Sequence, residues 1–238
     1  MNRENASQKV AVVTGANRSD GLGHNLLLEY RRRSYTAIGA YRDPATSAPL
    51  LDLAKADPLV IALPLDVRSP QSFRTFGQEV RTRVQRCDLL VSNTGLPATR
   101  QPLHQAGYNE LLEQLQVHAL ALVALAQVLV PIMPRGSLIV NISSGLGSLQ
   151  RMGSGYPGYS PAKTAANAFA RQLAATLRDQ GIGVVSLSPG AFRSNLGGQG
   201  WAGTADEAAS VVAKRIDALT MADSGSFLSA ATGEPIPW

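Results

Sequence analysis

The chain has 238 residues, of which 45% are hydrophobic and 16% are charged, and its formal net charge is +5. This length fits one α/β domain spanning residues 1–238, and the composition excludes a disordered protein. The positive charge does not indicate a nucleic-acid partner, because the arginines are scattered. Their one cluster, 31–33, lies where a helix is expected to end, and the helix dipole favours cations there.

A single cysteine, Cys87, excludes an internal disulfide and fits a reducing compartment. The first residues, MNRENASQK, are not followed by the apolar run of a signal peptide, so we expect a cytoplasmic protein. The most apolar stretch, 117–133, contains His118 and Gln127 and is shorter than a spanning helix. We expect it to form a helix buried inside the protein and expect no membrane partner.

Strands and helices are expected to alternate along the whole chain. Short β-branched runs predict strands at 10–14, 35–41, 59–65, 89–92, 137–143, 183–188 and 227–228. Helical patterns fall at 22–33, 46–56, 70–84, 108–130, 159–179 and 205–219, with Ser69-Pro70 and Thr204 as helix starts. The alternation predicts a single α/β domain with a Rossmann-type doubly wound parallel sheet of about seven strands, covered by helices on both faces. Such sheets bind ligands at the carboxyl ends of their strands.

The first predicted strand runs into a glycine-rich loop, VAVVTGANRSDGLG, and then into a helix. Gly15, Gly21 and Gly23 would let the backbone approach a pyrophosphate, and the free amides of the helix N-terminus would attract its charge. A tight turn without a ligand is the alternative.

A helix that begins near Tyr159 would place Lys163 on the same face, four residues later. An ammonium beside the phenol would lower the tyrosine pKa, so that the hydroxyl could donate and accept protons near neutral pH. The strand in SLIVNISS delivers Ser143 and Ser144 to its carboxyl end, where a hydroxyl could bind the same carbonyl oxygen. Alternatively, these serines only open a polar loop.

Five segments, TGANRSDGLG, SNTG, NISS, YSPAK and SPG, occur in the order and spacing of the short-chain dehydrogenase/reductase family. The chain resembles this family over essentially its whole length. Its later segments PGAFRSNLGGQG, IDALTMADSGSF and TGEPIPW are similar to the small carbonyl-reductase branch, which includes the C-factor and sniffer-like proteins.

The resemblance implies that Tyr159 is the acid/base, that Lys163 holds the nicotinamide ribose and that Ser144 orients the substrate oxygen. It implies no metal. The cofactor contacts that it implies are Gly15, Asn17, Arg18, Gly21, Leu22, Gly23, Arg42, Asp66, Val67, Asn93, Thr94, Gly95, Tyr159, Lys163, Pro189, Gly190 and Ser194.

The choice of cofactor depends on the adenosine ribose, where NAD enzymes generally place an acidic residue after the second strand. Here that strand ends in AYRD, with Arg42 first, and Arg18 lies in the glycine loop. Two cations would favour a 2′-phosphate, so we expect NADP(H) over NAD(H). Alternatively, either arginine covers a helix end, and Asp43 is an acid at the same place.

Two features depart from the family pattern. Ser19 and Asp20 look inserted in the glycine loop, and an acid beside a pyrophosphate is unfavourable unless the loop bulges outward. His118 lies where the family has an asparagine that holds a water of the proton relay. It either takes over this catalytic task, since imidazole titrates near neutral pH, or is a satisfied core residue.

The expected activity is reversible hydride transfer between NADPH and a small organic or secondary-metabolite carbonyl, with reduction favoured. Segment 195–203, with Trp201, would form a mobile lid or a simple surface connection. The alternatives are a non-redox cyclase, isomerase or dehydratase on the same fold, or a nucleotide-sensing binding protein. The family pairs helices such as 108–130 and 159–179 between subunits, which implies a homodimer or homotetramer.

Overall fold

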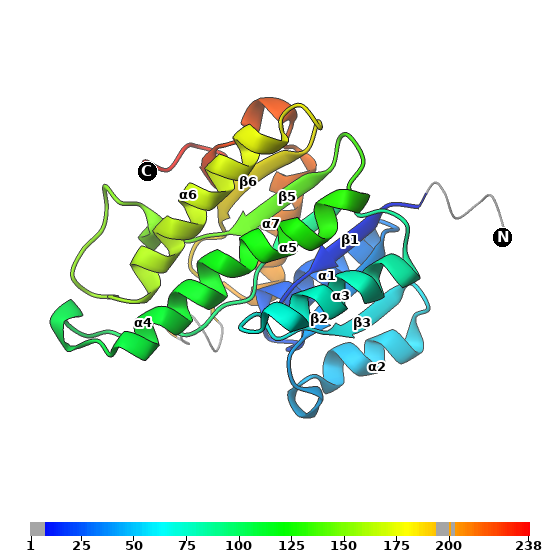
Figure 1. Ribbon diagram of the computed structural model, residues 1–238, viewed down its shortest axis with the longest axis horizontal. Coiled ribbons are helices and arrows are strands. Elements are labelled where there is room, and N and C mark those ends of the chain that lie inside the picture. The colour runs from blue at the N-terminus through cyan, green and yellow to red at the C-terminus, as the bar shows by residue number, and fades with distance from the viewer. Residues whose placement is uncertain (1–7, 194–199, 201–202) are drawn as a thin grey trace.

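The computed structural model describes residues 8–193, 200 and 203–238. All its named strands belong to one parallel sheet of seven strands in the order β3-β2-β1-β4-β5-β6-β7 (Figure 1). The predicted Rossmann-type fold is confirmed. The strands are β1 (Val10–Val13), β2 (Thr36–Tyr41), β3 (Val60–Pro64), β4 (Leu89–Ser92), β5 (Leu138–Ile142), β6 (Gly183–Ser188) and β7 (Phe227–Ser229).

Helices cover both faces of the sheet (Figure 1). One face carries α1 (Leu22–Arg32), α2 (Ala48–Ala56) and α7 (Ala205–Asp217). The other carries α3 (Pro70–Arg83), a continuous helical segment made of α4 (Tyr108–Leu115), η4 (Gln116–Leu120) and α5 (Ala121–Leu129), and α6 (Tyr159–Leu177). Single-turn helices lie at η2 (Pro44–Thr46), η3 (Leu103–Gln105), η5 (Val130–Ile132), η6 (Gly145–Gly147) and η7 (Met221–Asp223).

The strand residues alternate between two apolar cores because successive side chains point to opposite faces. In β1, Val10 and Val12 pack toward α3, α5 and α6, whereas Ala11 and Val13 pack toward α1 and α7. Both faces of the central strands are therefore buried, which explains why their sequences are apolar throughout instead of alternating.

Two helices begin where the sequence predicts. The Ser69 side chain caps α3 by accepting a hydrogen bond from the Ser72 N–H, and Pro70 occupies the first turn. At α7, Thr204 and Glu207 form a reciprocal capping box, which satisfies two amides that the helix itself leaves free.

The long apolar segment is buried on one side only. Val117, Leu122 and Leu125 belong to the core, whereas Leu112 and Leu120 are exposed. The helical stretch Tyr108–Ile132 is long and apolar enough to cross a membrane by length and composition, but its inner side packs on the sheet and on α6. The prediction of a helix buried inside the protein is therefore met on its inner side alone.

Candidate active site

Residues that follow β1 and β4 meet at the carboxyl edge of the sheet, because parallel neighbouring strands end at the same edge. Asn93 Nδ2 donates to the Thr14 carbonyl (2.9 Å), and the Asn93 N–H donates to Thr14 Oγ1 (2.9 Å). The Thr94 N–H also donates to Thr14 Oγ1. Sequence reasoning missed Thr14, although its place directly before the first glycine of the loop was a usable signal.

The glycine loop is packed too closely for side chains. Gly15 has a φ of +66°, which favours glycine. A Cβ at Gly23 would lie 2.4 Å from the Gly15 carbonyl oxygen and 2.5 Å from Asn93 Nδ2. The first turn of α1, which begins at the buried Leu22, has no acidic residue, and its N-cap Gly21 supplies no side-chain cap. The backbone amides there can therefore bind an anion, as a dinucleotide pyrophosphate requires.

The two inserted residues form a tight turn. The Gly21 N–H donates to the Arg18 carbonyl (2.9 Å), and Asn25 Nδ2 donates to the Ser19 and Gly21 carbonyls. Asp20 forms a two-point ion pair with the Arg18 guanidinium (3.0 and 3.1 Å), which lowers the pKa of the carboxyl. The Arg18 guanidinium thereby compensates the negative charge of Asp20 within the loop.

This ion pair bears on the expectation that Arg18 and Arg42 are two cations for a 2′-phosphate. Arg18 is already engaged by Asp20. Arg42, directly after β2, is exposed and forms no ion pair with the described residues, although its charge helps lower the pKa of Asp66. Arg42 is therefore the cation available to a phosphate without breaking a contact.

The remaining predicted cofactor residues lie along the same edge. The Asp66 carboxylate is bound by the Arg68 guanidinium (3.0 and 2.9 Å), which lowers its pKa, and the neighbouring Val67 is buried. Asn17 Nδ2 donates to the Thr46 carbonyl. Residues Gly95, Pro189 and Gly190 follow the ends of β4 and β6. Ser194 and most of segment 195–203, including Trp201, lie outside the described residues.

Tyr159 is the first residue of α6, as predicted, and Lys163 lies one turn later. The Lys163 Nζ donates to the Ile142 carbonyl (2.7 Å) and lies 5.7 Å from the centroid of the Tyr159 ring. Ser144 lies near enough to Tyr159 to lower the pKa of its hydroxyl, and the Ser144 Oγ accepts a hydrogen bond from the Leu146 N–H. The Ser143 Oγ is buried without a partner among the described residues, so Ser144 is the serine that meets the tyrosine.

Burial controls the protonation of this group. It lowers the pKa of Lys163 to about 8, and it raises the pKa of Tyr159 by more than Ser144 lowers it. The expectation that Lys163 lowers the tyrosine pKa is therefore wrong for the free protein. Desolvation of the phenolate is the larger effect, and Ser144 is the group that lowers the pKa of Tyr159.

A buried hydrogen-bond network fixes the Ser144 loop to α6. The Gly147 carbonyl accepts from Thr164 Oγ1 (3.0 Å) and from Asn167 Nδ2 (3.1 Å). Asn141 Nδ2 in β5 donates to Asn167 Oδ1. Sequence reasoning did not identify these residues, although polar side chains on the apolar side of a helix were a signal. These hydrogen bonds hold the loop that carries Ser144 at a fixed position relative to α6, which carries Tyr159.

His118 touches the tyrosine but does not titrate as expected. Its ring lies edge-on to Tyr159, with centroids 5.1 Å apart, and its Nε2 accepts from the Leu96 N–H (3.2 Å). Burial first, and then the charge of Lys163, lower the His118 pKa to about 2. The expectation that it titrates near neutral pH is therefore wrong.

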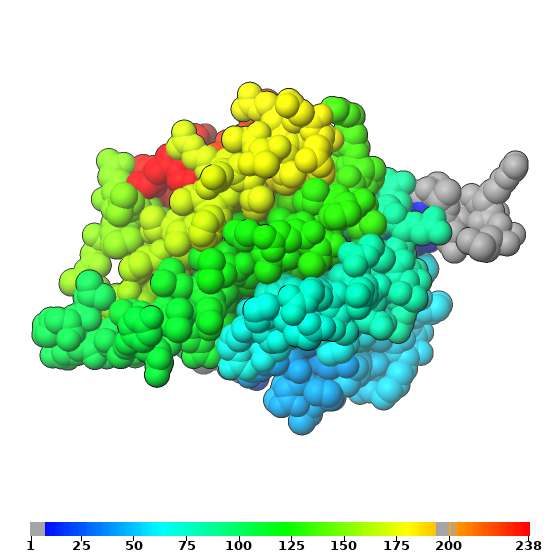
Figure 2. Space-filling model, in the orientation of Figure 1, coloured from blue at the N-terminus to red at the C-terminus, as the bar shows by residue number. Residues whose placement is uncertain are grey.

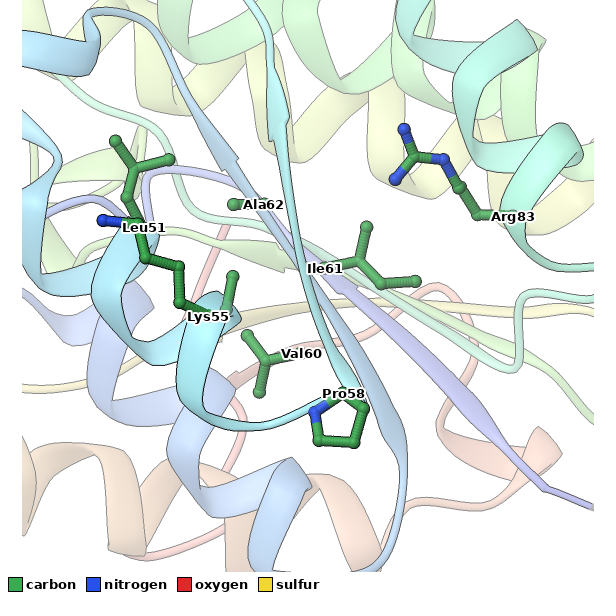
Figure 3. A pocket seen from close by; sticks show the side chains of 8 residues that line it. Leu51, Lys55, Pro58, Val60, Ile61, Ala62 and Arg83 are labelled. Atoms are coloured by element: carbon green, nitrogen blue, oxygen red, sulfur yellow. The ribbon is translucent and has the colours of Figure 1, made fainter.

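Two pockets of the described residues lie away from the tyrosine. A pocket of about 460 Å³ lies at the free edge of β3, where Lys55 and Arg83 approach it from α2 and α3 (Figure 3). A pocket of about 380 Å³ lies between the inserted turn and the start of α7. Among the described residues, no group of three or more His, Cys, Asp or Glu could hold a metal.

A parallel sheet with an open glycine loop, a buried lysine and a tyrosine at its carboxyl edge defines a Rossmann-fold oxidoreductase. The profile of the short chain dehydrogenase family matches residues 9–203, and the chain belongs to this family.

The known proteins that are similar to it include the following three. An oxidoreductase of Schizosaccharomyces pombe is 28% identical over 196 residues, covering 79% of this chain and 76% of the relative. The carbonyl reductase Sniffer of D. melanogaster is 25% identical, with a TM-score of 0.90 and coverage of 97% and 100% of the two chains. The NADPH-bound carbonyl reductase from chicken fatty liver is 27% identical, with a TM-score of 0.88 and coverage of 97% and 99%.

Proposed function

We propose that this oxidoreductase is an NADPH-dependent carbonyl reductase that acts on a ketone or aldehyde of a small organic or secondary-metabolite substrate. The observation that carries the proposal is the contact of Ser144 and Lys163 with Tyr159 at the carboxyl edge of the sheet. The family and the carbonyl-reductase neighbours support it.

The residues at this edge fit a nicotinamide dinucleotide. Its pyrophosphate would lie against the glycine loop, where a Cβ at Gly23 would not fit, and beside the open N-terminus of α1. We propose NADP(H) over NAD(H), because Arg42 offers a cation after β2 that forms no ion pair with the described residues, and because a neighbour at 27% identity binds NADPH. When bound, the reduced nicotinamide supplies the hydride.

The chain's own residues supply the proton and hold the carbonyl. The Ser144 hydroxyl donates to the carbonyl oxygen, and Tyr159 gives that oxygen its proton as the hydride reaches the carbon, so that the carbonyl becomes an alcohol. The Lys163 ammonium has one N–H on the Ile142 carbonyl and two left. Those two are available to the ribose and to the phenolate that the proton transfer leaves behind.

The test is Tyr159→Phe, with Tyr108→Phe as the matched control, because Tyr108 is 78% exposed on α4. NADPH binding is followed by fluorescence, and a panel of carbonyls is followed by nicotinamide absorbance. We expect Tyr159→Phe to lower kcat by about 10²–10⁴-fold without weakening NADPH binding, because it removes only the proton donor.

The same measurements separate the alternatives. Tight NADPH binding by the wild type without turnover of any carbonyl would favour a nucleotide-sensing binding protein. Failure to bind either cofactor would favour non-redox chemistry, such as that of a cyclase, isomerase or dehydratase. Full activity of Tyr159→Phe would contradict the proposed mechanism.

A further inference from the structure

Two buried side chains in the α4–η4 segment each keep one polar atom without a partner among the described residues. These atoms are Gln114 Oε1 and His118 Nδ1, and both residues are only 4% exposed. Buried polar atoms are nearly always hydrogen-bonded, to protein or to ordered water. Two such atoms one helical turn apart point to a common partner that the described residues do not supply.

The two side chains bridge the same pair of segments. Gln114 Nε2 donates to the Pro97 carbonyl (2.9 Å), and His118 Nε2 accepts from the N–H of the preceding residue, Leu96 (3.2 Å). On the α6 side, a Cβ at Gly158 would lie 2.9 Å from Gln114 Cγ, and the next residue, Tyr159, contacts the His118 ring. Gln114 and His118 therefore lie side by side between segments 96–97 and 158–159.

Their free atoms are complementary. Because His118 Nε2 accepts a hydrogen bond from a backbone N–H, the neutral ring carries its proton on Nδ1, which is a donor. The ring stays neutral because it is buried and because Lys163 of α6 repels an imidazolium. Gln114 uses its NH₂ group on the Pro97 carbonyl, so Oε1 is an acceptor.

We infer that Gln114 and His118 bind one buried water beside Tyr159, and that this water fixes the His118 ring as the wall against which the tyrosine is positioned. The water accepts from Nδ1–H and donates to Oε1, which gives it the two partners that a buried water needs. A substrate group is a poorer occupant because both side chains are sealed from solvent.

His118 is accordingly a positioning residue and not a proton carrier. A carrier must accept one proton and release another, but the lone pair of Nε2 is already occupied by the Leu96 N–H. The consequence for catalysis rests on the proposed function, whereas the water site itself does not.

The water site is tested in the free protein by ¹⁵N NMR of the imidazoles. The chain has three histidines, and the spectrum of His118→Asn identifies the signals of His118. We expect the Nδ1–H tautomer throughout about pH 5–9. Gln114→Met should shift the Nδ1–H signal, whereas Gln127→Met, the same change at an exposed site of α5, should not. A crystal structure should show one water within hydrogen-bond distance of both atoms.

The inference is overturned if His118 carries its proton on Nε2, titrates near neutral pH, or gives the same signals in Gln114→Met as in the wild type.

The positioning role of His118 is tested by kinetics. Gln114→Met should lower kcat by about three- to tenfold, by the same factor at every pH and with unchanged NADPH affinity, because misplacement of the proton donor slows the step without changing what titrates.

A shifted pKa in the pH profile of Gln114→Met would instead show a proton relay, and an unchanged kcat would remove the positioning role. If the wild type reduces no carbonyl, the proposed function fails, while the NMR result still decides the water site.

Discussion

Asp20 reduces the positive charge that the glycine loop presents to an anion, because it pairs with Arg18. It holds the Arg18 guanidinium through two hydrogen bonds, and both side chains are about half exposed (51% and 47%). An exposed ion pair of this kind adds little stability. Its effect on ligand binding is larger, because a phosphate that approaches Arg18 must displace a carboxylate that is already there.

We therefore expect Asp20→Asn to tighten NADPH binding by about three- to tenfold, since it frees a cation and removes a repelling charge. Arg42→Ala should weaken NADPH binding by about tenfold and NADH binding much less, because only NADPH carries the 2′-phosphate. Fluorescence titrations with both cofactors measure these effects. Asp52→Asn, at an exposed carboxylate paired with Lys55, is the control. Weaker NADPH binding in Asp20→Asn would show that the turn, and not Arg18, determines affinity.

The lowered pKa of His118 predicts how the free energy of unfolding depends on pH. In the unfolded chain a histidine takes up a proton below about pH 6.5, whereas the folded protein keeps His118 neutral down to a pKa of about 2. The unfolded state binds more protons across this window, so stability falls as the pH falls.

From pH 7 to pH 5 this single group should lower the free energy of unfolding by about 2 kcal/mol. Urea unfolding of the wild type and of His118→Asn at both pH values measures the difference. His104→Asn, at an exposed histidine, should keep the wild-type dependence. If His118→Asn loses as much stability on acidification as the wild type does, the histidine is not held neutral.

The strands and helices could be predicted because each one carries a local signal. β4 and β6 agree with the predicted bounds, since apolar β-branched runs end at polar residues. The π-helical turn η4 was not predicted, because its hydrogen bonds depend on packing against α6. The Tyr159 pKa was predicted in the wrong direction, because the sequence shows which charge is near the phenol and not how dry its surroundings are.

The contact between β1, α1 and β4 depends on glycine. We expect Gly23→Ala to weaken NADPH binding by more than about tenfold and to lower stability by about 1–3 kcal/mol, because its Cβ would overlap the Gly15 carbonyl and the Asn93 side chain. Thermal unfolding and cofactor titration measure both effects. Gly107→Ala is the control, since a Cβ there meets nothing within 4 Å and its φ is −70°. Wild-type binding by Gly23→Ala would mean that the loop can move aside.

The helical segment Tyr108–Ile132 has two different sides. The inner side carries Gln114 and His118 and packs against α6. The outer side exposes Leu112, Leu115 and Leu120, with exposed fractions of 38%, 37% and 48%. Figure 2 shows that the surfaces of α4 and α5 (green) and α6 (yellow) adjoin on one face. A row of exposed leucines on one face is costly for a monomer in water.

We propose that this face pairs with a second copy of the chain, as a homodimer or as one interface of a homotetramer. Leu112→Glu combined with Leu120→Glu should then dissociate the assembly, because two carboxylates would be buried without partners. Analytical ultracentrifugation measures the mass. Val211→Glu, at an exposed apolar site of α7 on the other face of the sheet, should leave this interface intact.

Because the same helical segment positions Tyr159 through His118, the dissociated variant should also lose part of its kcat while it keeps its NADPH affinity. A wild-type protein that sediments as a monomer at every concentration would refute the interface.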